Sequence, residues 1–112
     1  MARETRDGEA RVAMVPDLVG KLTALGCVVT VEPGAGTGAQ IADAEYAAVG
    51  ALLDERAVDE ADVVVSVQPL DPGAVRRLRR GAATISFLPT NAELALVADL
   101  RDVGATAFAM EL

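Results

Sequence analysis

Short apolar runs recur along the chain, and polar segments containing glycine or proline separate them. The continuous β-branched run Val63-Val64-Val65 is typical of a strand that is buried on both faces, as in a parallel sheet. The other runs have similar lengths and lie between segments with helical spacing. We therefore expect five short strands, at residues 27–31, 51–53, 63–67, 84–88 and 106–110.

Helix start and stop residues fill the gaps between these runs. Pro16 suits the first position of a helix that ends at Gly26. Asp43 is the expected N-cap of a short helix at 44–49. A further helix is expected to begin at Asp71-Pro72 and to end at Gly81.

The last helix is expected to begin with a capping box in which Thr90 is the cap and Glu93 reaches back to it. Gly104 would end this helix just before the final strand. Strands and helices then alternate through the chain. This order predicts an α/β fold, an open and mainly parallel sheet of about five strands with flanking helices, of the flavodoxin-like or Rossmann-like kind.

The composition narrows the class of protein. The 112 residues suit a single domain, of which 52% are apolar, so a core can form without many aromatic side chains. A net charge of −7 and only three aromatic residues argue against a nucleic-acid partner. The absence of histidine excludes Ser-His-Asp triads and most zinc sites. Cys27 lies beside two valines and is expected to be a small buried residue.

Several charged or glycine-rich segments can be explained by an ordinary structural role as well as by a functional one. The loop at 34–39 has the spacing G-x-G-x-G-A, which differs from the dinucleotide fingerprint, so we expect a tight turn. The basic cluster at 76–80 is expected to be a solvated helix end, with an anionic partner surface as the alternative. The acidic residues at 54–55 and 59–62 are expected to form a solvated face.

Two residues are candidates for binding. Gln68 and Pro89 follow expected strands, at the edge of an open sheet where ligands bind. Gln68 suits either a polar ligand or a capped strand end, and both remain open. Arg11 lies in the charged opening segment and suits a carboxylate, carboxamide or phosphate. The alternative for Arg11, which the sequence favours, is a local ion pair with Glu9 or Glu4.

A series of separate motifs then follows one order over nearly the whole chain. They are Arg3-Glu4-Thr5, Gly8-Glu9, Arg11-Val12-Ala13, Pro16, Glu32-Pro33-Gly34-Ala35-Gly36, Ala61-Asp62-Val63, Val67-Gln68-Pro69 and Ala107-Phe108-Ala109-Met110-Glu111. In this order they resemble the N-terminal domain of the alanine dehydrogenase and pyridine nucleotide transhydrogenase superfamily.

Two positions separate the branches of that superfamily. By this resemblance, Gln68 occupies the position at which alanine dehydrogenases have a lysine that binds the keto acid. Pro89 occupies the position at which they have a catalytic histidine. The resemblance therefore points to the NAD(H)-binding component, the alpha subunit, of proton-translocating NAD(P) transhydrogenase. It implies hydride transfer between NAD(H) and NADP(H), with no catalytic side chain and no metal, and with Arg11 and Gln68 lining the cofactor cleft.

The same resemblance implies partners and a location. The partners would be the remaining NAD-binding half of the alpha subunit and the membrane and NADP-binding components, with a homodimer in the complete enzyme. The enzyme would be cytoplasmic and peripheral to the inner membrane. Alternatives are the N-terminal domain of an amino-acid (alanine) dehydrogenase and a non-catalytic α/β interaction module, such as a receiver-like domain.

The family's usual first strand precedes Arg3, where this chain has only Met1-Ala2. We therefore expect residues 1–112 to be one partial domain, a fragment truncated at both ends. In a sheet of the 2-1-3-4-5 type the missing strand is central, so strand 27–31 would lack its inner neighbour. The fragment alone is expected to be weakly stable, not to bind NAD tightly and not to transfer hydride.

Overall fold

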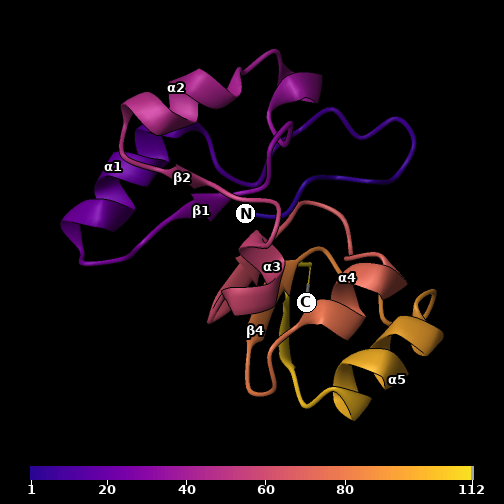
Figure 1. The fold of residues 1–112 in the computed structure, drawn as a ribbon. Coiled ribbons are helices and arrows are strands. Elements are labelled where there is room, and N and C mark those ends of the chain that lie inside the picture. Colours follow the sequence, from indigo (N-terminus) through magenta and orange to yellow (C-terminus); the bar gives the residue numbers. More distant parts are fainter. Residues whose placement is uncertain (112) are drawn as a thin grey trace.

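The expected α/β fold is confirmed in the structure, a computed structural model that describes residues 1–111 (Figure 1). The strands are β1 (Thr30–Val31), β2 (Leu52–Leu53), β3 (Val63–Val65), β4 (Ala83–Ser86) and β5 (Thr106–Ala109). The helices are α1 (Pro16–Ala24), α2 (Asp43–Ala48), α3 (Ala57–Glu60), α4 (Pro72–Arg77) and α5 (Leu94–Asp102), with a 3-10 turn η1 (Thr37–Ala39). All strand pairings are parallel, β1 with β2 and β3-β4-β5 in that order.

The first two residues join these two groups of strands. The Met1 ammonium donates to the Thr30 carbonyl at 2.6 Å, and the Met1 carbonyl accepts from Glu32 N at 3.1 Å. On the other side, Ala2 N donates to the Val65 carbonyl at 3.1 Å. This is the pattern of a parallel ladder. The expectation that β1 lacks an inner neighbour is therefore wrong, because Met1 and Ala2 occupy that place.

The resulting order across the molecule is β2-β1-(Met1–Ala2)-β3-β4-β5. If Met1–Ala2 is counted as the first strand, this is the doubly wound order 3-2-1-4-5-6, in which the strand order changes direction at the first strand. It differs from the 2-1-3-4-5 order by having the extra strand β2 outside β1. The switch point lies between Ala2 and β3. Ligands of open α/β sheets bind outside the carboxyl ends of the strands at such a point.

Two apolar clusters cover the two sides of this switch point. One lies between α1, α2 and β1, where Val19, Val31 and the only tyrosine, Tyr46, are fully buried. Tyr46 Oη donates to the Met14 carbonyl at 2.7 Å, and burial raises the pKa of this phenol. The other cluster gathers the inner faces of α4 and α5 on β3. Met1 belongs to the first cluster and Ala2 to the second.

Several expected helix boundaries differ from those observed. Asp43 is not a cap, because α2 begins at this residue and its carboxylate accepts from Gly34 N at 2.9 Å. The capping box at Thr90 is absent, because α5 begins only at Leu94. The helix expected to reach Gly81 ends at Arg77. The short helix α3 was not expected from the pattern.

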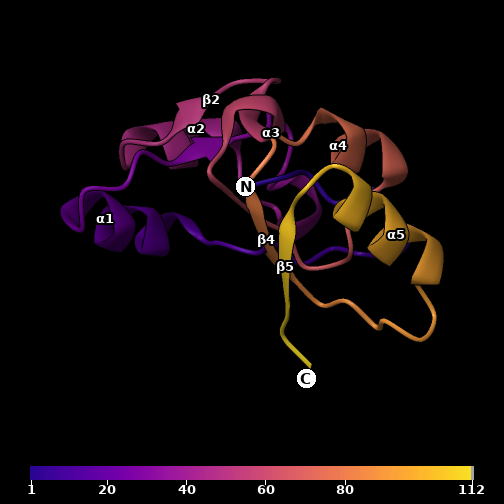
Figure 2. The same cartoon turned by 90° about the horizontal axis from the view of Figure 1, so that it is seen from below.

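Cys27 is exposed, so the expectation of burial is wrong. The apolar run beginning there reaches the sheet only at Thr30, and Val28 before it is 80% exposed. β5 pairs with β4 at the edge of its sheet and lies beside it in Figure 2. The side chains from Thr106 to Phe108 along this strand are also exposed. Across the described part of the chain, no helix has the length and apolar character to cross a membrane.

Candidate functional site

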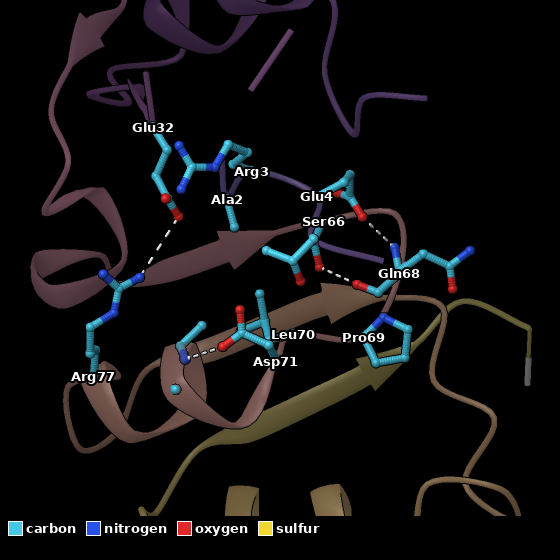
Figure 3. Close-up of a pocket in the computed structure, with 13 residues that line it drawn as sticks. Ala2, Arg3, Glu4, Glu32, Ser66, Gln68, Pro69, Leu70, Asp71 and Arg77 are labelled. Carbon is cyan, nitrogen blue, oxygen red and sulfur yellow. Dashed lines mark hydrogen bonds and ion pairs between the residues drawn. The ribbon is translucent and has the colours of Figure 1, made fainter. Parts of the chain in front are cut away.

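A cavity of about 340 Å³ lies at the switch point, bounded by the segments that leave the first strand and β3 (Figure 3). Its walls come from the residues after Met1, from the β3–α4 loop and from the first turns of α4. The lining residues are Ala2, Arg3, Glu4, Thr5, Glu32, Ser66, Gln68, Pro69, Leu70, Asp71, Gly73, Ala74 and Arg77. The cavity therefore occupies the place where the topology predicts ligand binding.

Glu4 holds the β3–α4 loop in place. Its two carboxylate oxygens accept from Val67 N at 2.8 Å and from Gln68 N at 2.9 Å. Ser66 Oγ donates to the Gln68 carbonyl at 2.7 Å within the same loop. Backbone donors on a carboxylate form charge-assisted hydrogen bonds, which are stronger than neutral ones. The loop thus has a defined conformation although it belongs to no helix or strand.

The two cations that line the cavity lie near other polar groups. The Arg77 guanidinium lies 3.9 Å from a Glu32 oxygen and 3.6 Å from an Asp59 oxygen. Arg3 donates to the Pro33 carbonyl at 3.3 Å. Asp71 caps α4 by accepting from Ala74 N at 2.7 Å. The cavity is therefore polar and of mixed charge, which does not single out an anionic ligand.

Beside the cavity, Glu9 joins the two residues that the sequence singles out. Its carboxylate accepts from Arg11 Nε at 2.9 Å and from Arg11 Nη2 at 2.7 Å, as a bidentate ion pair. The same Oε1 accepts from Gln68 Nε2 at 2.8 Å. The Arg11 guanidinium lies over the Phe87 ring at 6.0 Å from its centroid. We refer to Glu9, Arg11, Gln68 and Phe87 as the Glu9 cluster.

The hydrogen bonds from Arg11, and then that from Gln68, lower the pKa of Glu9 to about 2. Glu9 in turn raises the pKa of Arg11. The folded pKa of Glu9 lies below its ordinary value of 4.5, so the pair contributes stability fully above pH 4.5. That contribution is lost as the pH falls through about 2. At neutral pH the cluster is a carboxylate, a guanidinium and an amide.

The structure places the two candidate residues differently. Gln68 lines the cavity, but Figure 3 shows its side chain turned away from the space between Arg3, Ser66 and Asp71. Arg11 is not among the residues that line the cavity. The local ion pair of Arg11 with Glu9 is confirmed. The sequence did not predict the hydrogen bond from Gln68 to Glu9 or the hydrogen bonds from Val67 N and Gln68 N to Glu4.

The glycine loop is a turn, as the sequence favours. Its amides bond within the loop and to its neighbours: Ala35 N to Glu32 O, Thr37 N to Gly34 O, and Gly34 N to Asp43. A side chain at Gly36 would meet the Ile41 carbonyl at 2.5 Å, so close packing explains this glycine. The loop has few free amides for a phosphate.

The basic cluster and Pro89 fit the ordinary explanations, whereas the expected solvated acidic face is wrong at Asp59, whose Oδ1 is buried 3.6 Å from Arg77 Nε. Arg76, Arg77, Arg79 and Arg80 are exposed at and beyond the end of α4. Pro89 is exposed after β4, and its carbonyl accepts from Ala92 N at 2.9 Å. Within residues 1–111, no group of three or more acidic or cysteine side chains is arranged to hold a metal ion.

Comparisons with known proteins agree on one family. The profile of the family described as alanine dehydrogenase/PNT, N-terminal domain, matches residues 1–112. The NAD(P) transhydrogenase subunit alpha of Cereibacter sphaeroides is 40% identical over 98% of this chain and 22% of that protein. An alanine dehydrogenase of Mycobacterium tuberculosis is 36% identical over 96% of this chain and 30% of that protein.

Solved structures give the same result. The transhydrogenase of Sinorhizobium meliloti superposes with a TM-score of 0.93 and 34% identity, over 97% of this chain and 33% of that one. An L-alanine dehydrogenase superposes with a TM-score of 0.89 and 31% identity, over 96% of this chain and 30% of that one. The chain spans between a fifth and a third of the length of these relatives.

Proposed function

The chain belongs to the alanine dehydrogenase/PNT N-terminal domain family, and from this premise we propose that it forms part of the NAD(H)-binding component of a proton-translocating NAD(P) transhydrogenase. The observation that carries the choice of branch is the pair Gln68 and Pro89 at the carboxyl edge. Neither side chain can move a proton. Direct hydride transfer between two nicotinamides needs no side-chain acid or base, whereas amino-acid oxidation does.

The residues around the cavity suit the nicotinamide end of a dinucleotide better than its pyrophosphate. The glycine loop uses its amides internally, which argues against a pyrophosphate cradle on this chain. The Glu9 cluster and the β3–α4 loop offer instead a polar, rigid wall beside a cavity. NAD(H), when bound to the complete enzyme, supplies the hydride. The role proposed for this chain is to orient the nicotinamide end and to exclude water from it.

A domain exchange tests this proposal. The chain would replace the N-terminal domain of the Cereibacter sphaeroides subunit alpha and, separately, that of the Mycobacterium tuberculosis alanine dehydrogenase. We expect hydride transfer from NADH to an NADP analogue to stay within about tenfold of the parent. Alanine oxidation should fall by at least about 100-fold, because the acid–base group is missing.

The reverse pattern would contradict the proposal and would support the alanine dehydrogenase alternative. Loss of both activities in chimeras with native circular dichroism would also contradict it, in favour of a non-catalytic module. The isolated 112-residue chain is expected to give no tight NADH binding by fluorescence titration.

A further inference from the structure

One face of β4 and β5 is not covered by a helix in the described part of the chain. Along β4 the side chains of Thr84 and Ser86 are buried, whereas those that alternate with them are partly exposed, up to 41% at Phe87. The buried side faces α4 and α5. We call the opposite side the open face, and it is formed by Val63, Ala83, Ile85, Phe87, Phe108 and Met110.

The first two helices do not reach the open face. α1 and α2 lie with β1 and β2, away from β5 (Figures 1 and 2). Their apolar cluster includes Val65 of β3 but no described residue of β4 or β5. Parallel sheets are normally covered on both faces, and a contiguous apolar patch on a soluble protein marks an interaction site. With Phe108 56% and Met110 61% exposed, the open face is such a patch.

The open face carries no charge. The chain has a net charge of −7, yet none of the six residues of this face is ionisable. At its carboxyl end, beside Phe87, lies the Arg11–Glu9 pair, which is neutral as a whole. A strongly charged partner therefore finds no complementary group on this face. Two identical copies, in contrast, can meet there without bringing like charges into contact.

The sizes of the side chains also make the open face complementary to itself. The row at the amino ends of the strands is small and consists of Val63, Ala83 and Thr106. The row at the carboxyl ends is large and contains Phe87 and Met110. In a two-fold dimer with antiparallel strands, the large row of each copy lies over the small row of the other. Side chains of stacked sheets interdigitate in this way at a spacing of about 10 Å.

We propose that the open face is the contact surface of a homodimer, in which the sheets β3-β4-β5 of two copies stack face to face with antiparallel strands. Phe108 pairs with Ile85 in the middle row, next to the two-fold axis. Because the open face has only three short strands, we expect a weak dimer, with a Kd of about 10–100 µM. This inference concerns the chain itself and does not depend on the proposed function.

Sedimentation equilibrium and NMR together test the dimer and its geometry. The chain would be studied from about 1 µM to about 1 mM, a range that brackets the expected Kd. Its mean mass should rise from 11.5 kDa toward twice that value. In a mixture of labelled and unlabelled chains, an intermolecular NOE should join the Phe87 ring to the Ala83 methyl group. Within one copy these groups are four residues apart along a strand, about 13 Å, so such an NOE arises only between copies.

Three variants distinguish this interface from general stickiness. Phe108→Glu places two carboxylates beside the two-fold axis and should weaken the dimer at least about 30-fold. Thr106→Phe adds apolar surface but fills the small row, so it should also weaken the dimer. Leu52→Glu alters a strand residue that is 57% exposed on β2 and should leave Kd unchanged. Circular dichroism checks that each variant folds, and Thr106→Phe keeps the test valid if Phe108→Glu does not fold.

The proposal is overturned if the chain stays monomeric at about 1 mM, well above the expected Kd. It is also overturned if folded Phe108→Glu dimerises like the parent, if Thr106→Phe tightens association, or if the dimer lacks the NOE between Phe87 and Ala83. A monomeric chain whose Phe108 ring is shielded from a soluble paramagnetic probe only in the domain-exchange chimera would assign the open face to the rest of a longer protein, against this proposal. Loss of hydride transfer in the chimera would refute the transhydrogenase assignment and leave the dimer in place.

Discussion

At the scale of single residues, two carboxylates from the opening segment organise a loop that is distant in the chain. Glu4 accepts from the backbone of Val67 and Gln68, 63 and 64 residues away. Glu9 accepts from the Gln68 side chain, 59 residues away. The charged residues of the opening segment therefore act as acceptors for the β3–α4 loop, and Arg11 completes the set of donors around Glu9.

Replacing Glu4 by Gln tests the first of these roles. One oxygen becomes an NH₂ group, which cannot accept, so either Val67 N or Gln68 N loses its partner. We expect a loss of about 1–3 kcal/mol in the free energy of unfolding, measured in urea. The exchange of the Val67 and Gln68 amide hydrogens should also become faster. Glu60→Gln is the matched control, expected within about 0.5 kcal/mol of the parent. Equal losses in the two variants would show that Glu4 does not hold the loop.

Sequence distance decides which site contacts could be predicted. The Arg11–Glu9 pair joins residues two positions apart, and a local ion pair is predictable from the sequence alone. The contacts of Glu4 and Glu9 to the loop depend on tertiary structure, so no spacing in the sequence indicates them. The position of Gln68 after a buried strand was predictable, but the direction of its side chain was not, because Glu9 sets that direction.

At the scale of elements, hydrophobic periodicity located all five strands, whereas the boundaries followed local chemistry. The ladder between β1 and β2 has only two paired positions, Thr30 with Leu52 and Val31 with Leu53. The strand expected at 27–31 is therefore reduced to Thr30–Val31. Helix caps were predicted with mixed success. Asp71, where a helix was expected to begin, caps α4 by accepting from Ala74 N, but Thr90, the expected cap of the last helix, lies in a turn four residues before the start of α5.

The two cap positions give a matched prediction. Asp71→Ala removes the acceptor for Ala74 N at the start of α4 and should lower the free energy of unfolding by about 1 kcal/mol. Asp71→Asn keeps an acceptor oxygen and should restore most of the loss. Thr90→Ala should change stability by less than about 0.5 kcal/mol, because Thr90 caps no helix. Thermal and urea unfolding would measure the free energy of unfolding of all three variants. A Thr90→Ala variant as destabilised as Asp71→Ala would contradict the observed start of α5.

At the scale of the whole molecule, the α/β class and parallel pairing were predictable because each apolar run and each helix agreed on one alternating order. The join between the two halves was not. Met1 packs with the α1–α2 cluster and Ala2 with the α4–α5 cluster, and the backbone of these two residues bonds to β1 and β3. Two residues are too short to show a periodic pattern, so the sequence gives no sign of a strand there.

This join predicts a specific effect of proline at position 2. Ala2→Pro removes the N–H that donates to the Val65 carbonyl, and it adds bulk to a residue that is only 3% exposed. Ala2→Val adds comparable bulk but keeps the N–H, so the difference between the two variants isolates the hydrogen bond. We expect Ala2→Pro to be less stable than Ala2→Val by about 1–3 kcal/mol, because the Val65 carbonyl is left without its partner.

Urea unfolding would be followed by Tyr46 fluorescence on the β1 side and by hydrogen exchange in β4 on the other side. If Met1–Ala2 couples the halves, the two transitions should separate in the proline variant. Coincident transitions, together with a proline variant as stable as Ala2→Val, would mean that side-chain packing alone holds the halves together across the switch point.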